Sequence, residues 1–115
     1  MPTESILQSI KKLLGIEPEY EVFDTDIVMH INSVFFILQQ LGVGPKTGFK
    51  IEGGTETWND FLPDSPNLES VKSYVYLRVR LLFDPPLNSS VIESINRQIS
   101  EYEWRLNAQA EFPES

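Results

Sequence analysis

The fold is decided by the stretch DTDIVMHINSVFFILQQLG, residues 24–42. Asp24 is expected to cap a helix here, with Asp26 beside its positive end and Gly42 closing it. One broad apolar stripe follows helical spacing and contains Ile27, Val28, Ile31, Val34, Phe35 and Leu38. Met29, Phe36 and Ile37 lie on other faces of the same helix. A helix that is apolar nearly all round is predicted to be buried on more than one side.

Helices are predicted on both sides of this stretch. The first has Thr3 as its cap and Gly15 as its stop, and its apolar positions at helical spacing are Ile6, Leu7, Ile10, Leu13 and Leu14. An acidic connector, residues 16–23, follows it. Another helix begins at the pair Ser65–Pro66 and ends near Phe83, because Asp84-Pro85-Pro86 cannot continue a helix.

The last predicted helix starts at a capping box of Ser90 and Glu93 and runs to about Gln109. Between the central helices, residues 42–54 hold five of the six glycines, which predicts a loop with a short strand-like excursion around Phe49 and Ile51. Residues 55–62 are expected to add one helical turn that anchors Trp58 and Phe61.

The sequence therefore predicts a single all-α domain over residues 1–115. It is a small bundle of four to five helices with a long glycine-rich loop that has room for a short strand or hairpin. A flexible C-terminal tail is expected from about residue 110.

Composition narrows the function. Seventeen acidic and nine basic side chains give a formal charge of −8, the wrong sign for gripping nucleic acid through its phosphates. The chain has no cysteine, so it forms neither disulfides nor cysteine metal sites, and a reducing cytoplasm suits it. No apolar run approaches the roughly 20 residues that span a bilayer, so no membrane role is expected.

Each motif that suggests chemistry has a simpler explanation. The loop Gly44-Pro45-Lys46-Thr47 lacks the glycine that a phosphate-binding loop needs before its lysine. His30 and Asp26 share a helix face, but two ligands fall short of a zinc site. Arg78 and Arg80 beside aromatic residues are expected to form salt bridges rather than to hold nucleic acid. We expect no catalytic residue, no cofactor and no metal.

The doubled apolar faces of the central helices allow two interpretations. In one, a compact bundle covers both faces of each helix. In the other, part of this surface is reserved for partner subunits, because large exposed apolar patches mark interfaces. The candidate subunit-interface residues are Met29, Phe36, Tyr74, Leu77 and Leu81.

Four segments carry a resemblance to a known family. They are SYVYLRVRLLFDPP at residues 73–86, EYEWRLN at 101–107, DTDI at 24–27 and QQLGVG at 39–44. Together they resemble the head-tail connector proteins of tailed bacteriophages, also called head completion or adaptor proteins. The resemblance covers nearly the whole chain, from about Ser5 to Ala110.

The resemblance implies a structural virion protein rather than an enzyme. Such a protein is made in the host bacterial cytoplasm, adds to the portal protein after DNA packaging and forms a ring below it. The ring is expected to be dodecameric, to receive a downstream neck or tail-completion protein and to let DNA pass without specific binding.

Portal docking is expected through the C-terminal segment, at Ala108, Gln109, Ala110 and Phe112, and through the loop at residues 44–54. Two alternatives from other classes stay open at this point. One is a small acidic regulatory or inhibitor protein that binds a cellular enzyme, and the other is an undetected hydrolase.

Overall fold

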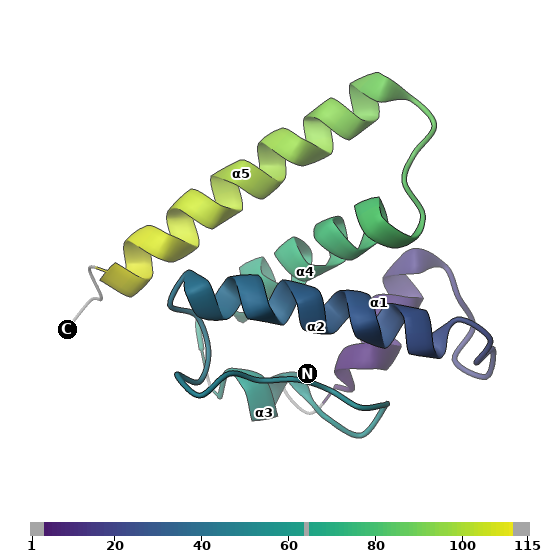
Figure 1. Ribbon diagram of the computed structural model, residues 1–115, viewed down its shortest axis with the longest axis horizontal. Coiled ribbons are helices and arrows are strands. Elements are labelled where there is room, and N and C mark those ends of the chain that lie inside the picture. Colours follow the sequence, from purple (N-terminus) through teal and green to yellow (C-terminus); the bar gives the residue numbers. More distant parts are fainter. Residues whose placement is uncertain (1–3, 64, 112–115) are drawn as a thin grey trace.

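The computed structural model describes residues 4–63 and 65–111, and this part of the chain contains five helices (Figure 1). They are α1 (Ile6–Leu14), α2 (Asp24–Gln40), α3 (Trp58–Phe61), α4 (Leu68–Phe83) and α5 (Ser89–Glu111). The described residues form no strand, only an isolated antiparallel bridge between Ser5 and Thr57. The prediction of a mainly helical domain is confirmed, whereas the short strand or hairpin in the glycine-rich loop is wrong.

Helix α1 is fixed at both ends. Its N-cap is Ser5, whose hydroxyl accepts a hydrogen bond from the Gln8 backbone N–H, while the expected cap Thr3 lies outside the described residues. Gly15 ends the helix with a φ of +82°, as predicted, because a left-handed residue suits glycine. The inner face of the helix buries Ile6, Leu7 and Ile10.

A buried lysine joins α1 to the acidic connector and to α2. The Lys11 side chain is fully buried, and its Nζ atom lies 2.8 Å from the Asp24 carboxylate. The same ammonium donates to the backbone carbonyls of Pro18 at 3.1 Å and Tyr20 at 2.8 Å. All three contacts satisfy a charge that is costly to bury alone, so they hold residues 15–23 in one conformation.

Helix α2 is the centre of the fold and packs against both α1 and α4. Its buried residues are Ile27, Ile31, Val34, Phe35 and Leu38, all from the predicted stripe. Asp24 is the first helical residue rather than the cap, because its carboxylate pairs with Lys11. Phe23 occupies the cap position and makes no capping hydrogen bond.

The glycine-rich loop is ordered by side chains instead of by strand pairing. The Asn32 amide donates to the Ile51 carbonyl at 2.9 Å and accepts from the Ile51 N–H at 2.8 Å, which satisfies both backbone groups of that buried residue. Gly44 has a φ of +90° and lies so close to Phe61 that an added Cβ atom would clash with the ring. Phe35 stacks on Phe61 with ring centroids 4.5 Å apart.

Helix α3 confirms the predicted helical turn. Thr57 and Asp60 form its capping box, and Trp58 and Phe61 are buried. The Trp58 indole N–H donates to the Ser9 hydroxyl at 2.7 Å, which ties α3 to α1.

Helix α4 starts two residues later than the predicted Ser65–Pro66 pair, because the Ser65 hydroxyl accepts from the Asn67 N–H and forms a turn there. It ends at Phe83, as expected. Helix α5 starts at Ser89. The side-chain oxygen of Asn88 accepts a hydrogen bond from the Ser90 backbone N–H, so Asn88 caps the helix instead of the predicted capping box of Ser90 and Glu93.

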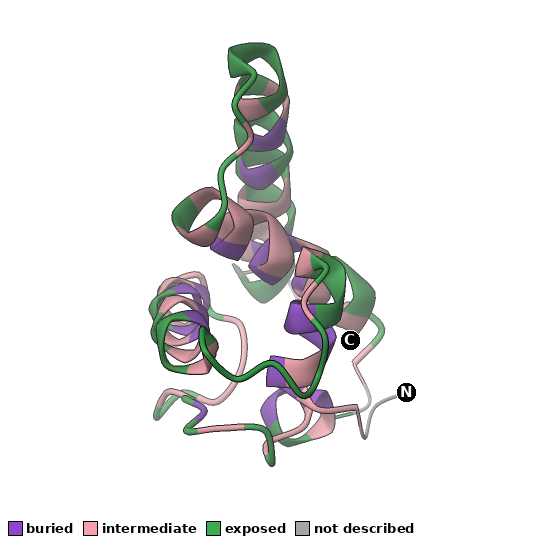
Figure 2. Ribbon diagram, turned by 90° about the vertical axis from the view of Figure 1, so that its right-hand side faces the viewer, coloured by how far each residue is buried: buried purple, intermediate pink, exposed green. Residues whose placement is uncertain are grey.

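Helix α5 crosses over α4 and stands above the other helices, with exposed residues along most of its surface (Figure 2). Its inner side buries Ile95, Ile99 and Leu106. In the part of the chain that the structure describes, none of the helices is long and apolar enough to cross a bilayer.

Replacing Lys11 tests whether its contacts hold the connector. Lys11→Met is expected to lower the free energy of unfolding by roughly 3 kcal/mol, because Asp24 and two carbonyls lose their partner in a mostly buried site. Urea denaturation measures the change. As a matched control, Lys12→Met alters the exposed neighbour and should stay within about 0.5 kcal/mol of the unchanged protein. Equal stability of the two variants would contradict the role of Lys11.

Candidate functional site

The residues predicted as a subunit interface separate into three groups. Met29 and Phe36 lie on the outward side of α2, where they are 63% and 60% exposed. Leu77 and Leu81 are half-buried and pack against the core. Tyr74 is fully buried within the single chain, so its assignment to exposed partner surface is wrong.

Tyr74 is buried because its hydroxyl has partners inside the protein. It donates to the Glu103 carboxylate at 2.7 Å and accepts from the Arg78 Nε at 2.8 Å. Arg78 also pairs with Glu103, which confirms the expected salt bridge for this arginine. This network of Tyr74, Arg78 and Glu103 joins α4 to α5.

The network changes how its members titrate. Burial, followed by the hydrogen bond to Glu103, raises the pKa of the Tyr74 hydroxyl far above its usual value. Partial burial opposes ionisation of Glu103, but the hydrogen bonds from Tyr74 and Arg78 and the charge of Arg78 outweigh that effect and lower the pKa of the Glu103 carboxyl. The ionised form of Glu103 therefore stabilises the joint between the helices.

An exposed aromatic surface that the sequence did not predict lies where the connector meets the ends of α2 and α4. Phe23 contacts Tyr20 with ring centroids 5.8 Å apart and Phe83 with ring centroids 5.2 Å apart, both edge-on. We call Tyr20, Phe23 and Phe83 the end cluster. Three further apolar side chains in the same segments are exposed: Val22, Leu82 and Leu87.

The surroundings of the end cluster are acidic. Glu17, Glu19 and Glu21 of the connector are exposed, and so is Asp84 directly after α4. His30 packs edge-on against Phe83, with ring centroids 6.5 Å apart. An apolar patch with an acidic border suits a protein partner that carries apolar and basic groups.

A second exposed surface runs along α5. Trp104 is 72% exposed, which is unusual for so large an apolar side chain. Arg97 and Arg105 are exposed on the same helix, and Arg105 pairs with Glu101 at 2.6 Å. Positions 97 and 104 are seven residues apart, so they share one side of the helix.

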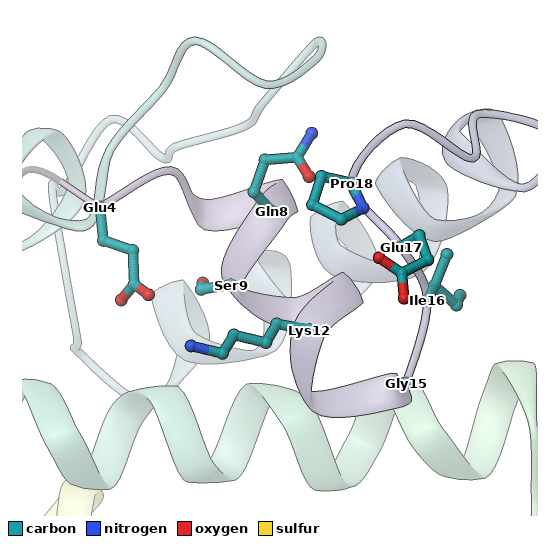
Figure 3. Close-up of a pocket in the computed structure, with 8 residues that line it drawn as sticks. All are labelled: Glu4, Gln8, Ser9, Lys12, Gly15, Ile16, Glu17 and Pro18. Atoms are coloured by element: carbon teal, nitrogen blue, oxygen red, sulfur yellow. The ribbon is translucent and has the colours of Figure 1, made fainter.

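A shallow groove follows α1 toward the end cluster. It has a volume of about 510 Å³ and is lined by α1 and the start of the connector, with Glu4 and Lys12 on one side and Glu17 and Pro18 on the other (Figure 3). An adjoining hollow of about 470 Å³ shares Gly15, Ile16 and Glu17 and reaches Tyr20. The groove is lined by both acidic and basic side chains, as protein contact surfaces often are, and we do not assign a small ligand to it.

The remaining candidate motifs make hydrogen bonds within the chain. Gly44 to Thr47 form a loop after α2, and Gln39 donates to the Lys46 carbonyl at 3.0 Å. Arg80 donates to the Tyr76 hydroxyl at 3.1 Å. Within residues 4–63 and 65–111, no three His, Cys, Asp or Glu side chains gather as they do around a metal ion.

The predicted docking residues are partly helical. Ala108, Gln109 and Ala110 lie in the last turns of α5, which extends to Glu111. Ala110 lies against Gly42, where an added Cβ atom would come within 2.8 Å of it. Phe112 lies outside the described residues.

The chain matches one protein family. A family model described as phage connector protein matches residues 6–113. No curated protein and no solved structure gave a match.

Replacing Glu103 tests the joint between α4 and α5 through its pH dependence. Because its folded pKa lies below the ordinary value of 4.5, its contribution to stability is present above that value and is lost as pH falls through the folded pKa. Glu103→Gln should therefore destabilise the protein at about pH 7, and the difference from the unchanged protein should narrow near about pH 3.

Urea denaturation at both pH values measures this difference. Glu101→Gln, which removes an exposed carboxylate from the same helix, is the control and should have little effect at either pH. A Glu103→Gln effect that is equal at both pH values would exclude an ionised Glu103 as the stabilising form.

Proposed function

Because this chain belongs to the phage connector protein family, we propose that it joins the DNA-filled head of a tailed bacteriophage to the tail by forming a ring below the portal. The match over residues 6–113 carries the proposal and confirms the resemblance seen in the sequence. The family is a structural one, and the proposed role includes no catalytic step.

The exposed apolar side chains support assembly with other subunits. Met29 and Phe36 on α2 are seven residues apart, so they form one outward stripe together with Ser33, which is also exposed. A monomer gains nothing from two large apolar side chains in water, whereas a neighbouring subunit covers them. We assign this stripe to contacts between subunits, whereas Leu77 and Leu81 on α4 are half-buried and pack against the core.

The charge of the chain supports a role around DNA without binding it. A formal charge of −8 repels phosphates, so a ring of such subunits forms a passage in which DNA slides without sticking. The same charge opposes self-association of free subunits until the portal supplies contacts. The ring then has twelve subunits, matching the twelve-fold symmetry of the portal, and lies at the head-tail interface of the virion.

Docking to the portal uses the end of α5 and the residues after it. Ala108, Gln109 and Ala110 are on the last turns of that helix, and Phe112 adds an apolar side chain to a polar segment. Each such contact is weak alone, but repetition around a ring multiplies them. The downstream neck or tail-completion protein then binds the opposite side of the ring.

The experiment that tests this function adds purified protein to portal-containing, DNA-filled heads that lack the connector. Electron microscopy should show a ring below the portal, and the completed heads should accept tails. One-to-one binding to an unrelated enzyme, with no attachment to heads, would instead favour a regulatory protein.

Charged substitutions on α2 and α4 distinguish residues that contact another subunit from residues that stabilise the core. Phe36→Asp is expected to leave the melting temperature nearly unchanged, because the side chain is exposed, but to abolish ring formation on heads. Leu77→Asp should destabilise the monomer, since it places a charge against the core. Ser70→Asp, at an exposed position of α4, is the control for added charge. Normal rings with Phe36→Asp would remove the α2 stripe from the interface.

A truncation tests the docking segment. Deleting residues 112–115 leaves α5 complete, so thermal melting should stay the same, while attachment to portal-containing heads should fall at least about tenfold through loss of repeated weak contacts. Sedimentation of heads with labelled protein measures attachment. If the truncated protein completes heads at normal efficiency, docking must use the loop at residues 44–54 or the helix faces.

A further inference from the structure

Two exposed apolar surfaces lie toward opposite ends of the molecule. The connector and the linker between α4 and α5 lie at one end of the longest axis, where α2 begins (Figure 1). The C-terminal half of α5, which contains Trp104, extends toward the other end. Two different surfaces placed in this way suit head-to-tail contacts, in which each subunit uses one surface toward each neighbour.

The end cluster is a prepared acceptor surface. Tyr20 and Phe23 are partly exposed although they contact each other and Phe83. The Lys11 ammonium binds the Tyr20 carbonyl and Asp24, so the connector is held in place on both sides of Val22. A surface that is already ordered loses little entropy when a partner binds.

The charges of the two surfaces are complementary. Residues 16–23 carry Glu17, Glu19 and Glu21 and no basic residue. Around Trp104, Arg105 is paired with Glu101 and Glu103 is bound to Arg78, so within the described residues Arg97 is the exposed arginine of this stretch that makes no ion pair. A tryptophan beside arginines is the composition that most often dominates the energy of a protein interface.

We infer that Trp104 of one copy packs on Tyr20 and Phe23 of the next copy, with Arg97 facing Glu19 and Glu21. This inference rests on the proposed ring and assigns its two contact surfaces. Because the two surfaces differ, the same contact repeats from copy to copy instead of forming a two-fold dimer. The chain of copies forms a ring when the rotation between neighbours closes.

Cysteine crosslinking tests the pairing, and the chain has no cysteine of its own. Val22→Cys marks the acceptor surface, and Ser100→Cys marks α5 one turn before Trp104; both positions are exposed. Mixed together at high concentration with a short thiol–thiol crosslinker, the two variants should form a covalent heterodimer, while neither alone should form a dimer efficiently. Ser70→Cys replaces Ser100→Cys as the control and should give only background yield.

Two further measurements distinguish the apolar contribution to the contact between copies from the charged contribution. Adding Trp104→Ala to the Ser100→Cys chain should lower the yield at least about tenfold, as expected for a central interface tryptophan. Adding Arg97→Gln to the Ser100→Cys chain should lower the yield as well, because it removes the charge that faces the acidic connector. Thermal melting of the variants confirms that they are folded.

Three results would overturn the inference. Efficient crosslinking of Ser100→Cys with itself would indicate a two-fold contact between α5 helices. A yield with Ser70→Cys equal to that with Ser100→Cys would show random collision. No heterodimer, either in solution or on heads, would exclude the contact.

Failure of the inference and failure of the proposed function are distinguishable. If the unchanged protein joins heads while the heterodimer does not form, only this assignment of surfaces is wrong. If the unchanged protein does not join heads, the proposed function is wrong whatever the crosslinks show.

Discussion

The ammonium of Lys11 is the constraint on which the rest of the structure depends. A charge without solvent contact must be satisfied by the protein, and here the Asp24 carboxylate and two carbonyls of the connector do so. Their positions set the start of α2 relative to α1 and fix the path of residues 15–23. The end cluster is a consequence, because Tyr20 and Phe23 remain near the surface only while the connector between them cannot collapse onto the core.

Helix α5 is attached to α4 both by apolar contacts and by a polar network. Its inner side contributes Ile95, Ile99 and Leu106 to the core, while Glu103 binds Tyr74 and Arg78 on α4. Apolar contacts alone allow a helix to slide by a turn, whereas a carboxylate with two specific donors fits in one register. The polar network therefore specifies where α5 lies, and with it where Trp104 is presented.

The sequence predicts those features that depend on neighbouring residues. Gly15 marks the end of α1 because the left-handed conformation that ends the helix depends on that residue alone. The apolar stripe from Ile27 to Leu38 marks the inner side of α2 because helical spacing also depends only on residues close in sequence. Tyr74 was misassigned because its partner Glu103 is 29 residues away. The strand expected around Ile51 is absent because the Asn32 side chain satisfies the backbone there. The end cluster joins the connector to the end of α4, and the sequence alone does not show that these two segments meet.

The contacts of the first helix also bear on the order in which the protein folds. Ser9 on α1 binds Trp58, 49 residues later, and Glu4 binds Lys72, 68 residues later. Such distant pairings have to close long loops before they stabilise anything, which slows folding relative to a bundle of neighbouring hairpins. On the ribosome, α2 emerges soon after α1 and covers part of it, whereas Trp58 and Lys72 emerge only in the second half of the chain. The last contacts that hold residues 4–14 in place therefore form only after α4 has emerged.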